Sequence, residues 1–72
     1  MDKVKLNNEI KVYRAKFNIS QRELAEKIGV TRKTINTIET GRFVPSTILA
    51  LKISHFFLVT VEDVFQIDKE EL

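Results

Sequence analysis

The sequence predicts an all-α domain of five short helices, and three observations lead to this prediction. Residue types that favour helices are abundant, whereas only two glycines and one proline occur among the 72 residues. The glycines and the proline all stand where a helix should begin or end. Apolar residues recur at spacings of three and four, which is typical of helices with one buried face. Because no repeat or long linker divides the chain, we expect one domain spanning residues 1–72.

The first helix is expected to begin near Asn8, whose side chain can accept a hydrogen bond from an unpaired N–H of the first turn. Glu9 would then lie in that turn, where the helix dipole favours a negative charge. Ile10, Tyr13 and Phe17 would share one face, at the spacings of three and four that direct a helix toward a core.

Capping residues mark the start of the second and third helices. The segment from Ser20 to Glu23 is a capping box, which predicts a second helix over residues 21–28. Thr31 can cap a third helix over residues 32–40, and Gly41 can adopt the left-handed conformation that ends it. The expected inner faces consist of Leu24, Ala25 and Ile28 in the second helix and Ile35 and Ile38 in the third.

The fourth and fifth helices follow the only proline. Pro45-Ser46 predicts the start of a fourth helix, and the segment from Thr60 to Asp63 resembles a second capping box. The fifth helix is expected to be short and to run through Phe65. The core residues expected from the fourth helix are Leu49, Ile53, Phe56 and Phe57.

Polar and apolar residues alternate near both ends of the chain, over residues 3–6 and 65–68. This period of two is typical of strands, and the two segments could pair as an antiparallel ribbon. An isolated two-stranded ribbon is marginally stable in water, so the ribbon would need a surface to pack against.

Composition excludes several classes of protein. The chain contains no cysteine and a single histidine, His55, so disulfides and a structural zinc site are not expected. No apolar run approaches the ~18 residues of a membrane span, and the start does not resemble a signal peptide, so we expect a cytoplasmic protein without membrane partners. We find no partnered nucleophile, phosphate loop or carboxylate pair, and therefore expect neither an enzyme nor a cofactor.

Charge is distributed unevenly along the chain. Residues 1–60 contain 11 Lys and Arg against five acids, a net charge of +6, whereas residues 61–72 carry a net charge of −4. A basic body with an acidic tail favours a surface that binds a polyanion. The alternative is a solvated surface with scattered charge.

The second and third helices are joined only by Gly29-Val30-Thr31, so residues 20–40 form a predicted helix-turn-helix unit. In such a unit the second helix lies in the major groove of DNA. If Ile35 and Ile38 are buried, the outward face carries cations, an amide and hydroxyls, while Glu39 lies toward the core. Such groups suit base edges and phosphates, although an ordinary polar helix surface is the alternative. The outward residues are Lys33, Asn36, Thr37 and Thr40, with Arg32 on the flank.

The segment over residues 19–46 strongly resembles the Cro/C1-type, or XRE, family of phage repressors. The resemblance rests on the Ser-Gln-x-x-Leu-Ala opening at residue 20, the Gly-Val-Thr turn, the Ile-x-x-Ile-Glu-x-Gly motif at residue 35 and the Pro-Ser pair at residue 45. It extends over residues 8–66. It implies a five-helix lambda-repressor-like DNA-binding domain, and compact members of this type add a small antiparallel sheet. It further implies a homodimeric transcriptional repressor that binds a palindromic operator in double-stranded DNA.

The resemblance also assigns roles to residues. It places Gln21 against a phosphate and makes Arg32, Lys33 and Thr37 base-reading residues, with Thr34, Asn36, Thr40 and Arg42 near the backbone or groove edge. A solvent-exposed Gln21 and an Arg42 that only complements the helix dipole are the alternatives. It implies a structural ion pair between Arg14 and Glu39. The full set expected to contact DNA is Gln21, Thr31, Arg32, Lys33, Thr34, Asn36, Thr37, Thr40 and Arg42.

Two positions depart from the family pattern. Leu58 stands where glycine or asparagine is common, so the turn after the fourth helix should differ or be strained. Ile48 should be exposed and, beside Phe56, Phe57 and Leu58, could join a subunit interface. An antitoxin or protein-interaction module that also represses its own operon remains the alternative function. No site for a small-molecule effector is evident.

Overall fold

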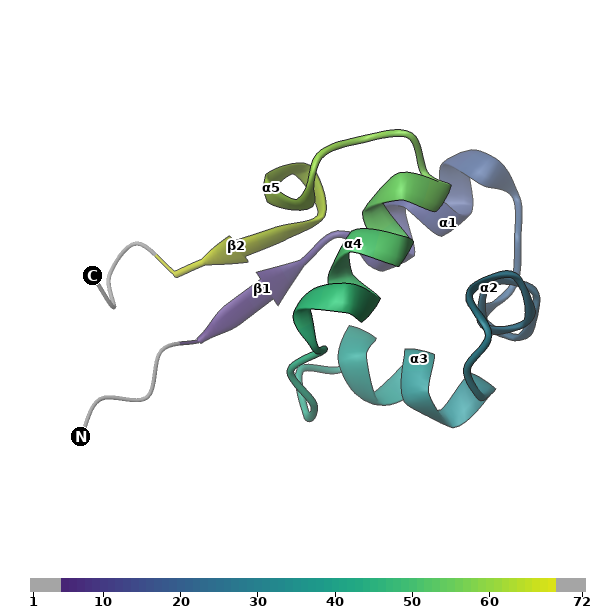
Figure 1. The fold of residues 1–72 in the computed structure, drawn as a ribbon, viewed down its shortest axis with the longest axis horizontal. Helices are drawn as coiled ribbons and strands as arrows, with labels where there is room; N and C mark the ends of the chain where they lie inside the picture. The colour runs from purple at the N-terminus through teal and green to yellow at the C-terminus, as the bar shows by residue number, and fades with distance from the viewer. Residues whose placement is uncertain (1–4, 69–72) are drawn as a thin grey trace.

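The computed structural model describes residues 5–68 of the chain, and its helices surround one small core (Figure 1). Short loops connect successive elements, and a two-stranded ribbon projects from the helical body. In chain order the elements are β1 (Leu6–Asn8), α1 (Ile10–Phe17), α2 (Gln21–Ile28), α3 (Arg32–Glu39), α4 (Thr47–Phe56), α5 (Val61–Val64) and β2 (Phe65–Ile67). The predicted all-α domain with a small antiparallel ribbon is therefore confirmed.

The starts of α2, α3, α4 and α5 are fixed by side-chain caps. Ser20 accepts a hydrogen bond from the N–H of Glu23, whose carboxylate in turn accepts one from the N–H of Ser20. Thr60 and Asp63 form the same reciprocal pair at the start of α5. A cap satisfies N–H groups that have no partner within the helix, and its loss costs about 1 kcal/mol. The remaining two caps are Thr31 for α3 and Ser46 for α4.

The core is built from the apolar faces of all five helices and the start of β2. The fully buried side chains include Leu24 of α2, Ile35 of α3 and Ile53 of α4. Around Phe57 the rings of Tyr13 and Phe17 pack at centroid distances of 5.5 and 5.1 Å. The other buried apolar residues are Ile10, Ala25, Ile28, Ile38, Val64 and Phe65.

The first helix begins two residues later than the sequence predicts. Asn8 pairs with Phe65 in the ribbon, so it is a strand residue, and Glu9 stands at the start of α1 without a side-chain cap. Asn8 nevertheless caps the helix from outside, because its Oδ1 accepts a hydrogen bond from the N–H of Ile10 at 3.1 Å. Phe17 also differs from expectation, since its ring packs on Phe57 while 42% of the residue stays exposed.

The bounds of four other elements differ from the prediction by one to three residues, and β2 ends at Ile67 rather than at residue 68. Thr40 caps α3 rather than belonging to it, and α5 stops at Val64 because Phe65 takes the extended conformation of β2. The first strand spans Leu6–Asn8 rather than residues 3–6, of which residues 3 and 4 lie outside the described chain. The antiparallel pairing of the two ends that the alternation predicts is present, and its register places Leu6 opposite Ile67.

Leu58 occupies the left-handed region of backbone space, with φ of +61°. Glycine adopts this conformation without steric cost, whereas a leucine does so only under strain. The expected strain in the turn after α4 is therefore present. Within residues 5–68, no helix is both long and apolar enough to cross a lipid bilayer.

Candidate nucleic-acid interface

Helices α2 and α3 form the predicted helix-turn-helix unit. Gly29 ends α2 with φ of +89°, and its N–H and that of Val30 both donate to the carbonyl of Ala25. The left-handed glycine reverses the chain within the short turn, which a side chain with a Cβ would resist. Ile35 and Ile38 then bury the inner side of α3. This leaves the opposite side of α3 on the surface of the molecule.

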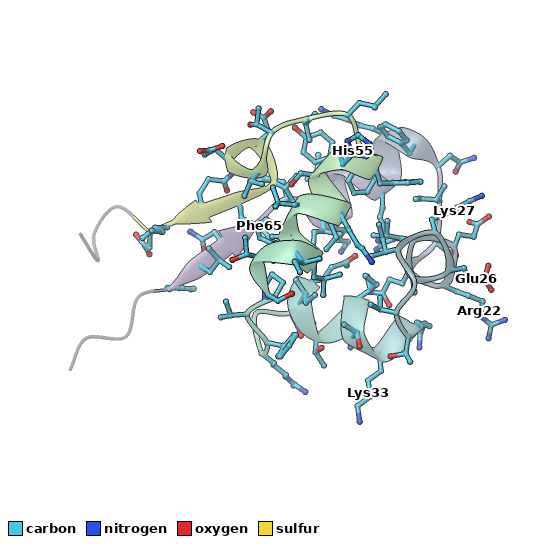
Figure 2. The ribbon with its side chains drawn as sticks, viewed as in Figure 1. Arg22, Glu26, Lys27, Lys33, His55 and Phe65 are labelled. Atoms are coloured by element: carbon cyan, nitrogen blue, oxygen red, sulfur yellow. The ribbon has the colours of Figure 1, made fainter. Side chains whose placement is uncertain are left out.

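The exposed side of α3 carries the polar groups that the sequence predicts. Arg32, Lys33 and Asn36 are exposed, and Figure 2 shows Lys33 pointing away from the body of the molecule. Thr40 is exposed as well, whereas Thr37 is half-buried. Among the described residues no carboxylate pairs with either cation, so this side of α3 presents net positive charge.

The threonines of α3 and of its two caps form hydroxyl hydrogen bonds within this segment. Thr37 donates its hydroxyl to the carbonyl of Thr34 at 2.9 Å, and Thr40 donates to that of Asn36 at 2.9 Å. The hydroxyls of Thr31 and Thr34 lie 3.0 Å apart, and Thr31 also caps the helix. These side chains keep free oxygen lone pairs and methyl groups, which suit donor groups and thymine methyls on DNA.

A network of hydrogen bonds around Glu39 holds α3 against α1 and α2. Arg14 of α1 donates to both carboxylate oxygens, from Nε to Oε2 at 2.6 Å and from Nη2 to Oε1 at 3.2 Å. Gln21 at the start of α2 donates from Nε2 to Oε1 of Glu39 at 3.1 Å. The predicted structural pair of Arg14 and Glu39 is thus present, with both side chains largely buried.

Gln21 reaches the exposed side of α3 as well. Its Nε2 donates to Oδ1 of Asn36 at 3.3 Å, and this contact directs the amide nitrogen of Asn36 outward. Gln21 is half-buried, so the alternative of a solvent-exposed side chain does not hold. Its side-chain donors are engaged, so the groups at this position that suit an anion are the backbone N–H groups at the start of α2.

Two structural contributors were not identified from the sequence. Asn8 of β1 donates from Nδ2 to the carbonyl of Ile38 at 3.1 Å, and thereby supports the last turn of α3 from the ribbon. The contacts of Gln21 with Asn36 and Glu39 likewise join residues far apart in the chain. No periodicity or cap motif reports such contacts, because they depend on how the helices pack.

Arg42 lies just beyond α3, in the loop that leads to α4. Gly41 takes the left-handed conformation with φ of +80°, and the N–H of Arg42 donates to the carbonyl of Thr37 at 2.9 Å. This contact closes the C-terminal end of α3 and keeps the exposed Arg42 beside it. The residues expected to contact DNA therefore gather on α3, at its two ends and, for Gln21, at the start of α2.

Comparisons with known proteins agree with this architecture. Residues 10–64 match a family model described as helix-turn-helix. A protein from Archaeoglobus fulgidus named as an uncharacterized HTH-type transcriptional regulator is 48% identical over 67 residues, which cover 93% of this chain and 94% of the relative. YgzD of Bacillus subtilis, which has the same kind of name, is 48% identical over 65 residues, or 90% of this chain and 98% of YgzD.

A solved structure has the same fold. The crystal structure of a protein from Bacteroides fragilis that is described as DNA-binding superposes with a TM-score of 0.76. It is 26% identical in sequence, and the match covers 85% of this chain and 98% of that one.

Proposed function

The chain belongs to the helix-turn-helix family of XRE-type, DNA-binding transcriptional regulators, and on that premise we propose that it is a repressor that reads a palindromic operator as a homodimer. Membership of this family makes the protein a regulator that binds DNA and not an enzyme. The proposal adds how the protein binds, in which oligomeric state, and with what effect on transcription.

The observation that carries the proposal is the exposed, acid-free side of α3. Arg32 and Lys33 present cations there, and Asn36 presents an amide whose Nδ2 donates to no partner within residues 5–68. Arginine and lysine suit the O6 and N7 atoms of guanine, and asparagine suits adenine. We assign base reading to Arg32, Lys33 and Thr37, as the family resemblance does. Because Asn36 lies on the same exposed side, we extend this role to Asn36, with α3 lying in the major groove.

Phosphate contacts are assigned to groups at the borders of this surface. The unpaired N–H groups at the start of α2, beside Gln21, suit an anion because of the helix dipole. The remaining polar residues at the ends of α3 are assigned to the backbone and groove edge. They are Thr31, Thr34, Thr40 and Arg42.

Repression follows if the operator overlaps a promoter, because a bound dimer then excludes the polymerase. Two copies related by a two-fold axis place their α3 helices in successive major grooves, ~34 Å apart, on half-sites of the same sequence. A palindromic operator and a dimeric protein are therefore expected together.

The test is selection of bound sequences from a random duplex library, followed by transcription in vitro from a promoter that overlaps the selected site. We expect a palindrome with half-site centres about 10 base pairs apart and a loss of transcript as the protein is added. An asymmetric site would contradict the dimer, an increase in transcript would contradict repression, and no enriched sequence would contradict base reading.

A further inference from the structure

One edge of the molecule carries large apolar side chains that are exposed to solvent. Val44 is 65% exposed, Ile48 69%, Leu51 52% and Ile67 47%. We call these residues, together with the half-buried Leu6, the ribbon face. Single exposed apolar residues are common on protein surfaces, but a contiguous group of them marks an interaction site.

The ribbon face is continuous because the ribbon and the start of α4 border a shared groove. Leu6 and Ile67 pair directly, so their side chains lie on the same face of the ribbon. A groove of about 220 Å³ runs between Leu6 and Phe65 on one side and Leu51 on the other. A second hollow, bordered by Val44, shares Leu6 and Phe65 with this groove. Leu51 thus borders the groove and Val44 borders the adjoining hollow. Ile67 is the strand partner of Leu6, and Ile48 precedes Leu51 by three residues on α4, so both adjoin the groove.

We propose that the ribbon face is the surface through which two copies of this chain associate, an inference that rests on the dimer of the proposed function. Its five residues carry no charge, so none of them can form an ion pair with an acidic or basic partner. A two-fold interface must be complementary to itself, and an apolar ridge beside an apolar groove meets that requirement. Leu51 and Ile67 of one copy fit the groove of the other.

The position of the ribbon face relative to α3 favours a second copy. The loop that follows α3 leads directly into Val44 and α4, so the ribbon face lies next to the C-terminal end of α3. Figure 1 shows α3 along the bottom of the molecule, with the ribbon and the start of α4 on one side of it. A two-fold axis through that side leaves both α3 helices on the same surface of the dimer, as binding to one duplex requires.

Leu58, which is 81% exposed, does not meet this requirement. Leu58 follows α4 at the end opposite to Ile48, and in Figure 1 that end of α4 lies away from α3. An interface there would place the two α3 helices at opposite ends of the dimer. Phe57 is buried, so the surface expected from the sequence, which groups Ile48 with Phe56, Phe57 and Leu58, is not formed. Ile48 and Leu58 are close in sequence, but they stand at opposite ends of α4 and therefore do not share a surface.

The test uses charged substitutions on the ribbon face and sedimentation of the full chain. We expect the wild type to be a dimer at micromolar concentration. Ile48→Asp and Val44→Asp should each weaken the dimer on the order of a hundredfold, because two like charges then meet at the interface. Leu58→Asp is the matched control, since aspartate adds the same charge and tolerates the left-handed backbone, and it should remain a dimer.

Folding and association can be separated in these variants. Position 48 lies in the first turn of α4, where a negative charge is favoured, so Ile48→Asp should keep the helical circular dichroism of the wild type. Thermal unfolding should depend on protein concentration in the wild type and not in this variant. Dimerisation of Ile48→Asp and Val44→Asp with the wild-type dissociation constant would overturn the proposal.

A second measurement uses the absence of cysteine from the chain. Ile48→Cys should be captured as a dimer by a short bismaleimide, with or without the selected duplex, whereas Leu58→Cys should not. The reverse pattern would overturn the proposal. A dimer that shows the expected pattern but enriches no duplex sequence would support the interface and refute the operator reading. A chain that stays monomeric with and without duplex but still prefers one sequence would refute the interface and support sequence-specific binding.

Discussion

Arg14 and Glu39 form a two-point contact in which Nε and Nη2 of the arginine donate to the two carboxylate oxygens of the glutamate. The same guanidinium donates from Nη1 to the carbonyl of Ile19 at 3.1 Å. Arg14 therefore connects α1 with the end of α3 and with the loop before α2. Because its planar fork matches a carboxylate, this contact fixes direction as well as distance.

Removal of one member of this pair should destabilise the fold. Arg14→Met leaves the largely buried carboxylate of Glu39 without its cation, and we expect a loss of about 3 kcal/mol in the free energy of unfolding. The double variant Arg14→Met, Glu39→Met should lose less than the single variant, because no buried charge then lacks a partner. Urea denaturation monitored by circular dichroism checks both values. A single variant as stable as the wild type would contradict a structural role for the pair.

Gln21 should affect DNA affinity more than stability. Gln21→Ala removes the hydrogen bonds to Asn36 and Glu39, and the free energy of unfolding should fall by about 1 kcal/mol. Operator affinity should fall about tenfold or more, since Asn36 then loses the contact that orients its amide. Fluorescence anisotropy with the selected duplex measures the affinity. The control Gln21→Glu places a carboxylate beside that of Glu39 and should lower stability further.

Two exposed lysines of the helix-turn-helix unit provide a matched test of base reading. Lys33 projects from α3, and Lys27 lies near the end of α2, well separated from Lys33 in Figure 2. Lys33→Ala should weaken specific binding by about 1–3 kcal/mol and relax the preference at one base pair. Lys27→Ala removes the same charge and should leave that preference unchanged. Equal losses on the operator and on random duplex would instead assign Lys33 to a phosphate.

Asp63 should make stability depend on pH at the acid end. Hydrogen bonds from the backbone and then the side chain of Thr60 lower the pKa of Asp63 from its ordinary value of 3.8. Because the pKa is lower in the folded chain, the stabilisation is complete above the unfolded pKa and is lost as pH falls through the folded value. Between roughly pH 5 and pH 2, the thermal unfolding temperature of Asp63→Asn should depend less steeply on pH than that of the wild type. Glu62→Gln, which removes a neighbouring carboxylate that does not cap α5, should follow the wild type.

The parts of the fold that the sequence predicts well are those fixed by local contacts. Ser20, Thr31 and Thr60 each bond an N–H three residues ahead, so their helix starts can be predicted from short motifs. The start of α1 was predicted two residues early because Asn8 bonds both the helix and a distant strand. The capping preference of Asn8 can be predicted from residue type, whereas its pairing with Phe65 forms only when the whole chain has folded.

The candidate site divides in the same way. Periodicity alone predicts which side of α3 is exposed, since Ile35 and Ile38 determine the buried side. It does not predict that Gln21 joins Asn36 to Glu39, because that contact depends on the angle between α2 and α3. The family resemblance supplied the pairing of Arg14 with Glu39, which spacing could not.

The ribbon also determines where the chain can be joined to other proteins. The N–H of Asp68 donates to the carbonyl of Lys5 at 3.0 Å, so both ends of the described chain leave the body side by side. A domain with adjacent ends can be inserted into a surface loop of a carrier, or permuted by linking its ends, without stretching its core. Because these ends are adjacent, the helical body and the ribbon can be moved as one unit into another protein.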